Sequence, residues 1–155
     1  MRLIDLIKEE MILVDLKCED KWDCIQRLVD WMVEKGKVES EHRDTVLTAL
    51  VDREKSMSTG MEHGVAIPHG QVTCVDDIVA VFATSRDGVP FESIDGQPAK
   101  LIILLVIPKD RFRKHIQTLA GIARLLNQSD LREELVRAET SKDIMGIISR
   151  RESDD

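Results

Sequence analysis

The strongest constraint on the fold of this chain is a continuous run of branched apolar residues at positions 101–107, which read Leu-Ile-Ile-Leu-Leu-Val-Ile. A strand with one face in solvent alternates polar and apolar residues, whereas an unbroken apolar run of this length is typical of a strand buried on both faces. Pro108 stops the run. The sequence therefore predicts a central strand whose two faces are both covered.

Around this run, stretches with helical spacing of apolar residues alternate with short branched stretches, which indicates an α/β fold with a sheet covered by helices. Asp20 is the expected cap of the second helix, and turns are expected at 86–90 and 95–96. We expect helices at residues 2–8, 21–35, 40–55, 109–126, 130–136 and 141–148, and strands at 11–16, 65–67, 78–85 and 101–107.

A length of 155 residues suits one domain, which we place at residues 1–150, followed by a charged, frayed tail at 151–155. The net charge of −7 argues against nucleic acid as a partner, because binding a phosphate backbone requires clustered cations. No secretory leader is expected, and no apolar run approaches the roughly 20 residues that span a bilayer, so no direct membrane insertion is expected. Three cysteines without a CxxC pair indicate reduced thiols in a cytoplasmic protein.

The segment 53–70 has the composition of a rigid, irregular site loop. Glycine permits close backbone approach and positive φ, and proline fixes φ, so a segment rich in both can hold a side chain at a set angle. Its glycines and proline are Gly60, Gly64, Pro68 and Gly70, and its histidines are His63 and His69. The short apolar run at 65–67 predicts a strand that delivers His69 to the end of a sheet, which makes His69 the candidate reactive residue.

The residues just before His69 are suited to binding an anion. Arg53 is a permanent cation, Ser56, Ser58 and Thr59 carry hydroxyl donors, and the glycines leave backbone N–H groups accessible. An imidazole beside an anion site indicates a phosphoryl acceptor. Two alternatives remain open here: a loop histidine without chemistry, and a metal site made by His63, His69 and Cys74, although these lack the tight paired spacing of structural zinc ligands.

These motifs resemble the active-site signature of the IIA domains of the phosphoenolpyruvate-dependent phosphotransferase system. The resemblance is to the fructose/mannitol type, closest to its nitrogen-regulatory branch, and it covers about residues 3–148. The residues that carry it are Ser58-Thr59-Gly60, Gly-Val-Ala-Ile-Pro-His-Gly at 64–70, Pro-Phe-Glu-Ser-Ile-Asp-Gly-Gln-Pro at 90–98, and His-Ile-Gln-Thr-Leu-Ala at 115–120.

The resemblance implies a mixed β-sheet flanked by helices on both faces and assigns roles to particular residues. His69 would accept the phosphoryl group, and His115 and Arg53 would stabilise it. Ser58, Thr59 and Gly60 would bind phosphate, with His63, Pro68 and Gly70 as neighbours of the site. Sequence reasoning alone leaves two plainer roles open: Arg53 as a cation at a helix C-terminus, and His115 as a solvent-facing helix residue.

The resemblance further implies a phosphotransferase component that works through a phosphohistidine intermediate, with no metal or organic cofactor. Its phosphoryl donor would be a phosphorylated HPr-like carrier protein. The favoured role is a nitrogen-regulatory switch whose output is a changed affinity for a regulatory target protein. The alternatives are a sugar-specific fructose or mannitol component that passes the phosphoryl group to a IIB domain, and a degenerate domain without transfer.

Overall fold

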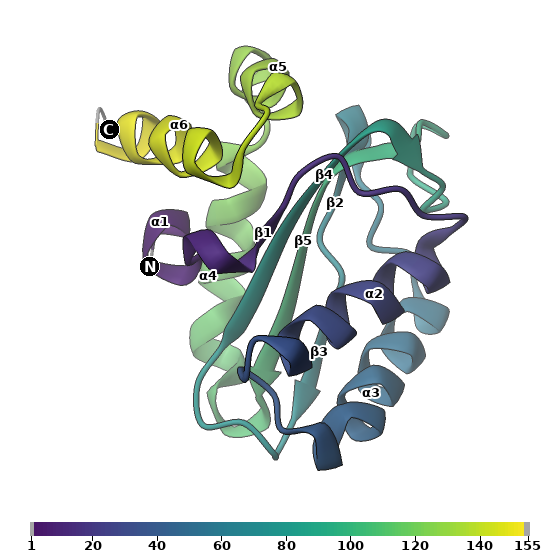
Figure 1. Cartoon of the computed structure of the whole chain (residues 1–155). Coiled ribbons are helices and arrows are strands. Elements are labelled where there is room, and N and C mark those ends of the chain that lie inside the picture. The colour runs from purple at the N-terminus through teal and green to yellow at the C-terminus, as the bar shows by residue number, and fades with distance from the viewer. Residues whose placement is uncertain (1, 154–155) are drawn as a thin grey trace.

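The computed structural model describes residues 2–153 and contains a five-stranded mixed sheet between two layers of helices (Figure 1). The strands are β1 (Ile12–Leu13), β2 (Val65–Ala66), β3 (His69–Val72), β4 (Val79–Val89) and β5 (Ala99–Pro108). The α-helices are α1 (Leu3–Leu6), α2 (Lys21–Glu34), α3 (Arg43–Ser56), α4 (Phe112–Leu125), α5 (Ser129–Arg137) and α6 (Ser141–Ser153). The predicted fold class, a mixed sheet flanked by helices on both faces, is confirmed.

Strand order places β5 at the centre of the sheet. The long strands β4 and β5 pair antiparallel, and β1 lies parallel to β4 on the outer side. On its other edge β5 pairs in parallel first with β2 and then with β3, so these two short strands follow one another along the same neighbour. The interruption between β2 and β3 falls at Ile67 and Pro68, directly before His69.

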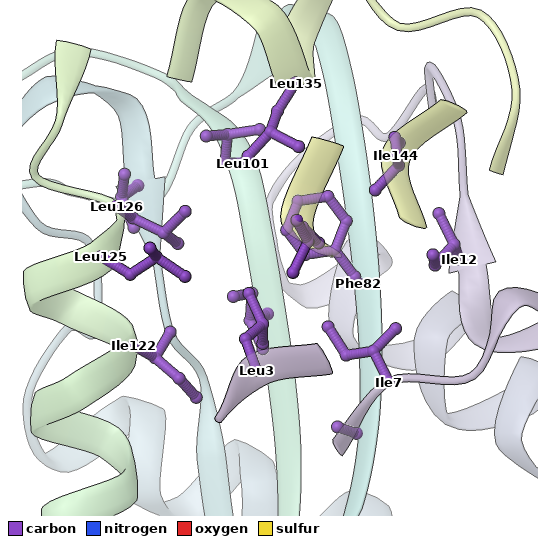
Figure 2. Packing of buried hydrophobic residues seen from close by; sticks show 14 of the residues in the cluster. Leu3, Ile7, Ile12, Phe82, Leu101, Ile122, Leu125, Leu126, Leu135 and Ile144 are labelled. Carbon is purple, nitrogen blue, oxygen red and sulfur yellow. The ribbon is translucent and has the colours of Figure 1, made fainter. Parts of the chain in front are cut away.

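The predicted central strand is confirmed as β5, in which every residue except Lys100 is buried. From Leu101 on, its odd-numbered residues, such as Ile103, pack into the core shared with α1, α4, α5 and α6, part of which Figure 2 shows. Its even-numbered residues, such as Leu104, pack into the second core, under α2 and α3. Full burial of one such side chain contributes roughly 1.5–3 kcal/mol, so this strand holds the two helical layers together.

Two predicted boundaries differ from the structure. The first strand is shorter than expected, because Asp15 adopts a positive φ of 53° that ends the extended backbone. The turn predicted at 86–90 is wrong, since β4 continues to Val89 after a register shift that begins at Thr84. Gly88, with φ of 82°, accommodates this bulge against Pro98, where a Cβ atom would lie 2.6 Å from the proline ring.

The C-terminal residues also differ from the predicted frayed tail, because α6 continues through Ser153. The Arg151 guanidinium lies 2.6 Å from the Asp130 carboxylate, and the Glu152 carboxylate accepts hydrogen bonds from the backbone N–H groups of Leu3 and Ile4. Contacts with α5 and α1 therefore order residues 151–153, while positions 154–155 of the predicted tail lie outside the described residues. No helix within residues 2–153 combines the length and apolarity needed to cross a bilayer.

Candidate functional site

A pocket of about 300 Å³ lies beside His69 and gathers several of the predicted site residues. Arg53 comes from the end of α3, and the segment 58–61 follows that helix. The rest of the wall comes from the segment around His69, from Ile94 between β4 and β5, and from α4. The residues that line it are Arg53, Ser58, Thr59, Gly60, Met61, Ile67, His69, Ile94, Leu119 and Ala120. Residues far apart in sequence therefore meet here as a cationic, hydroxyl-bearing pocket with one imidazole.

A small hairpin holds the wall of this pocket in place. The Met61 N–H donates to the Val65 carbonyl at 2.7 Å, and the Ile67 N–H donates to the Thr59 carbonyl at 3.2 Å. Gly60 lies so close to the segment 91–93 that a Cβ atom there would be 2.6 Å from Ser93 Oγ and 2.9 Å from the Phe91 carbonyl oxygen. Only glycine fits this position, and its role in the structure is to permit close backbone packing.

His69 begins β3 rather than lying at the end of the predicted strand, because the edge strand is interrupted just before it. Its backbone is opposite Leu105 of β5, while the Ile67 carbonyl in the interruption lies 2.9 Å from the ring Nδ1 of His69. A carbonyl can only accept, so Nδ1 carries the proton and donates it. In the neutral imidazole, the lone pair is therefore on Nε2.

The two residues beside His69 fix its backbone. The Pro68 carbonyl accepts a hydrogen bond of 3.0 Å from the Leu105 N–H, which anchors the interruption to the central strand. Gly70 packs against α3, where a Cβ atom would lie 3.2 Å from the backbone of Ala49 and Leu50. Both neighbours thus restrain the backbone that carries the imidazole.

The surroundings of His69 keep its ring neutral. Burial in the pocket lowers the pKa of His69, and the nearby Arg53 guanidinium lowers it further, whereas the Ile67 carbonyl and the Glu54 carboxylate act in the opposite direction. The net shift is downward from the ordinary value. At neutral pH the ring is therefore neutral, and its Nε2 can act as a nucleophile or base, as phosphoryl acceptance requires.

The sequence left two positions open for Arg53, the C-terminus of a helix and the edge of the site, and in the structure it occupies both. It lies in the last turn of α3, where its Nη1 donates to the Met57 carbonyl at 2.9 Å, and it also lines the pocket. One guanidinium nitrogen is thus used to hold the chain after the helix. The remaining N–H groups and the positive charge are available to an anion beside His69.

Of the three predicted hydroxyl donors, Ser58 and Thr59 line the pocket, and both give their protons to protein acceptors. Ser58 Oγ donates to the Phe91 carbonyl and accepts from the Gly60 N–H at 3.1 Å. Thr59 Oγ1 donates to the Glu54 carboxylate at 2.6 Å, and the Thr59 N–H donates to the same carboxylate at 2.8 Å. The two hydroxyls therefore shape the pocket in this state, and each would have to rotate to donate to a bound anion.

Sequence reasoning missed the buried charges behind Thr59. Glu54 is 2% exposed and Lys21 4% exposed, and the Lys21 ammonium lies 3.2 Å from Glu54 Oε2. Glu54 follows Arg53 directly and could have been noticed for that reason. Nothing local pairs it with a lysine near the start of α2, because the two positions meet only through the packing of α2 on α3.

His115 is buried, so the solvent-facing alternative is wrong. It is 2% exposed and lies on α4 one turn before Leu119, outside the set of residues that line the pocket. Its Nδ1 is 3.4 Å from Thr118 Oγ1, and its buried Nε2 has no hydrogen-bond partner within residues 2–153. Burial, with help from the charge of Lys114, lowers the pKa of His115.

His63 lies outside the pocket in the turn of the hairpin. Its backbone has a positive φ of 65°, and its N–H donates to Asp95 Oδ2 at 2.9 Å. The ring is exposed and contributes to a neighbouring hollow that shares Met61 and Ile94 with the His69 pocket. Histidine tolerates this left-handed backbone better than most residues do, so the role of His63 in the structure is to allow the turn.

The metal-site alternative does not match the arrangement of the side chains. Within the described part of the chain, the three potential ligands whose atoms lie within 4.8 Å of one another are Glu39, Glu41 and His42, near the start of α3. His63, His69 and Cys74 form no such group.

Comparison with known proteins agrees with this geometry. Residues 5–151 match the family described as "Phosphoenolpyruvate-dependent sugar phosphotransferase system, EIIA 2". The chain is 33% identical over 149 residues to a nitrogen regulatory protein of Bradyrhizobium diazoefficiens, covering 96% of this chain and 95% of that protein. It is 32% identical over 140 residues to the fructose-specific EIIA component of Haloferax volcanii, covering 90% of each.

Among solved structures, the nitrogen regulatory protein IIA-Ntr from Neisseria meningitidis superposes with a TM-score of 0.85 at 26% identity, covering 94% of this chain and 98% of that one. The resemblance drawn from the sequence motifs is therefore confirmed.

The environment of His69 predicts how its ring titrates. In a pH titration followed by NMR of the ring signals, the pKa of His69 should lie below the ordinary value of about 6.5. Arg53→Met should raise it, because a nearby positive charge is removed. Lys55→Met removes the same charge from an exposed position of α3 outside the pocket and serves as the control. A His69 pKa at or above the ordinary value, or equal responses to both variants, would contradict this description.

Proposed function

Because the chain belongs to the EIIA 2 family of the phosphoenolpyruvate-dependent sugar phosphotransferase system, we propose that it accepts a phosphoryl group on His69 from a phosphorylated HPr-like carrier. We further propose that the phosphorylated and free forms act as a nitrogen-regulatory switch. Phosphorylation would add charge and acceptor oxygens at one point of the surface, which is enough to create or disrupt a docking site.

The observation that carries the proposal is the fixed tautomer of His69. The Ile67 carbonyl holds the proton on Nδ1, burial keeps the ring neutral, and the nucleophilic lone pair is therefore on Nε2 of a residue that lines the pocket. A loop histidine that takes part in no reaction would need neither a ring held in one orientation nor a neighbouring cation such as Arg53.

The transfer step follows from this arrangement. The Nε2 lone pair of His69 attacks the phosphorus of the carrier's phosphohistidine, a new N–P bond forms, and the N–P bond of the carrier breaks with its electron pair returning to the carrier's imidazole. The carrier's ring would react with its other nitrogen protonated and leave as neutral imidazole, while phosphorylated His69 keeps its proton on Nδ1, so protons and charge balance. Transfer between two imidazoles is nearly symmetric, so catalysis depends mostly on positioning and on stabilising charge on the phosphoryl oxygens.

We assign that stabilisation first to Arg53, whose free guanidinium N–H groups adjoin the pocket. Ser58, Thr59 and the backbone near Gly60 would contribute once a hydroxyl rotates toward the phosphoryl group. His115 would contribute through its unpartnered Nε2, since a phosphoryl oxygen would supply the partner that this buried nitrogen otherwise lacks.

Apolar side chains around the pocket support the proposal that the phosphoryl donor is a protein. The large hydrophobic residues that are exposed within the described chain are Met57, Ile94 and Ile116, at 70%, 78% and 49% exposure. Ile94 lines the pocket, Met57 follows the helix that carries Arg53, and Ile116 lies one turn before the pocket residue Ala120 on α4. Exposed apolar groups gathered around a reactive residue favour docking of a protein over capture of a small molecule alone.

The regulatory role is favoured by the motif at 90–98 and by the segment 121–133, which resemble the nitrogen-regulatory branch. The similar nitrogen regulatory proteins are in keeping with it. The second candidate is a sugar-specific component that passes the phosphoryl group to a IIB domain, and the fructose-specific relative of comparable identity supports it. The two roles share the chemistry at His69 and differ in what receives the signal.

The first prediction of the proposed function concerns the acceptor. After incubation with phosphoenolpyruvate and the general phosphotransferase proteins, intact-mass measurement should detect one acid-labile phosphoryl group on the wild-type protein. His69→Ala should show no gain in mass, because the nucleophile is absent. His63→Ala, which alters the exposed histidine outside the pocket, should gain mass as the wild type does; a normal gain in His69→Ala would refute the assignment.

The second prediction concerns Arg53 and His115. Replacement by Met and Ala, respectively, should slow transfer to His69 while leaving the fold intact by circular dichroism. A charge-assisted hydrogen bond contributes roughly 1.5–3 kcal/mol, so the expected loss is on the order of tenfold to a hundredfold in rate. A transfer rate that is unchanged in His115→Ala would reduce that residue to a packing role.

The third prediction separates regulation from transport. When the purified phosphorylated protein is mixed with fructose- or mannitol-type IIB domains, a regulatory protein should retain its phosphoryl group and bind a target in one phosphorylation state only. Rapid catalytic transfer to a IIB domain, with sugar phosphate formed downstream, would instead establish the transport role.

A further inference from the structure

A buried ion pair lies directly behind the wall of the His69 pocket. Lys21, at the start of α2, and Glu54, near the end of α3, are almost completely shielded from solvent, and their charged groups are 3.2 Å apart. A second carboxylate, that of the exposed Glu92, approaches the same ammonium at 3.2 Å. Lys21 thus connects α2, α3 and the segment after β4.

Both oxygens of the Glu54 carboxylate are engaged by the pocket wall. Oε1 accepts the Thr59 hydroxyl at 2.6 Å, and Oε2 accepts both the Thr59 N–H at 2.8 Å and the Lys21 ammonium at 3.2 Å. One carboxylate therefore fixes the backbone and the side chain of a single residue that lines the pocket. Glu54 does not line the pocket, so it acts through Thr59.

The segment 91–93, which follows β4, is connected to the same ion pair. Glu92, which contacts Lys21, adopts a positive φ of 54° in the segment that packs onto Gly60, and Ser58 Oγ donates to the Phe91 carbonyl in that segment. The residues immediately before and after Thr59 are therefore held by the segment 91–93, while Thr59 itself is held by the Glu54 carboxylate in addition to the bond from the Ile67 N–H to its carbonyl.

Stability alone is a weak reason for such a pair. Burying two charges carries a desolvation cost that their attraction often fails to exceed, and well-packed apolar residues of similar size serve stability equally well. A buried carboxylate with a matched cation has one property that an apolar pair lacks: it provides directional acceptors that set the position of N–H and O–H donors.

We propose that Lys21 and Glu54 form a positioning pair for phosphoryl transfer, in which the Glu54 carboxylate holds Thr59 in the wall of the His69 pocket and Lys21 keeps that carboxylate in place. This inference rests on the proposed function, because it concerns the rate of transfer to His69. Lys21 and Glu54 act through Thr59 and touch neither the donor nor the phosphorus.

The experiment compares Glu54→Gln, Lys21→Met and the double variant with wild type, using phosphorylated carrier as the varied substrate. Glutamine keeps the shape of Glu54 but is uncharged, and it places an NH2 group, which cannot accept a hydrogen bond, where the carboxylate has one of its two oxygens. One of the two bonds by which Oε1 and Oε2 hold the Thr59 hydroxyl and the Thr59 N–H is therefore lost. Glu54→Gln leaves Lys21 paired with Glu92, and the double variant removes both buried charges, so these two designs avoid leaving an isolated charge in the core. Lys21→Met leaves the Glu54 carboxylate without its cation, so the fold of that variant is checked by circular dichroism.

The maximal transfer rate of Glu54→Gln should fall on the order of tenfold to a hundredfold, because a small displacement of a positioning group has effects of that size. KM for the carrier should stay unchanged, since the exposed apolar residues around the pocket are untouched. The double variant should lose no more than Glu54→Gln alone, because two residues that act through one carboxylate are not additive.

Glu92→Gln is the matched control. It removes a charge in contact with Lys21 but from a side chain that is 76% exposed, and it leaves both acceptors of Thr59 in place. Its transfer rate should equal that of wild type. A rate in Glu54→Gln equal to that of Glu92→Gln, or a rise in KM in place of a fall in maximal rate, would overturn the proposal.

The same assay separates this inference from the proposed function. If wild-type protein gains no phosphoryl group on His69, the proposed function fails. If wild type is phosphorylated but the rate losses of Glu54→Gln and Lys21→Met simply multiply in the double variant, the pair does not act as one unit and the inference fails while the function stands.

Discussion

The reactivity proposed for His69 depends on one hydrogen bond, from its Nδ1 to the carbonyl oxygen of Ile67. That bond exists because the edge strand is interrupted between β2 and β3, so that the Ile67 carbonyl lies where the ring of the next histidine can reach it. Pro68, which has no N–H, occupies the interruption, and its own carbonyl remains bonded to the central strand. Backbone geometry therefore decides which ring nitrogen can react.

The rest of the fold supplies a rigid frame for this interruption. β5, buried on both faces, pairs with the strands on either side of the break, and the two helical layers pack on its alternating side chains. Figure 2 shows part of one of these two cores. Gly70 allows α3 to approach β3 closely, which brings Arg53 and the segment after it to the same pocket as His69. Low dielectric and a fixed cation then keep the imidazole neutral.

Much of this could be read from the sequence because the signals are local. The apolar run of β5, the glycine- and proline-rich segment before His69, and the Asp20 cap, whose side chain accepts from the Asp23 N–H, each follow from composition or spacing. The extension of β4 through the expected turn was missed because a bulge with Gly88 looks like a turn in sequence.

Other features could not be predicted because they arise only from tertiary packing. The charged residues 151–153 suggested a frayed tail, and they are ordered because α1 and α5 supply partners for Glu152 and Arg151. The burial of His115 depends on how α4 packs, and the pairing of Lys21 with Glu54 depends on the contact of α2 with α3. Charges buried in this way have no signature in local spacing.

The most direct test of the central claim is the position of the phosphoryl group on the ring. Protein labelled with ¹⁵N in its histidines and phosphorylated through the carrier can be examined by ¹⁵N–³¹P NMR, which distinguishes the two ring nitrogens. Because Nδ1 is held by the Ile67 carbonyl, the phosphorus should be bonded to Nε2 of His69. A phosphoryl group on Nδ1 of His69, or on another histidine, would contradict the account.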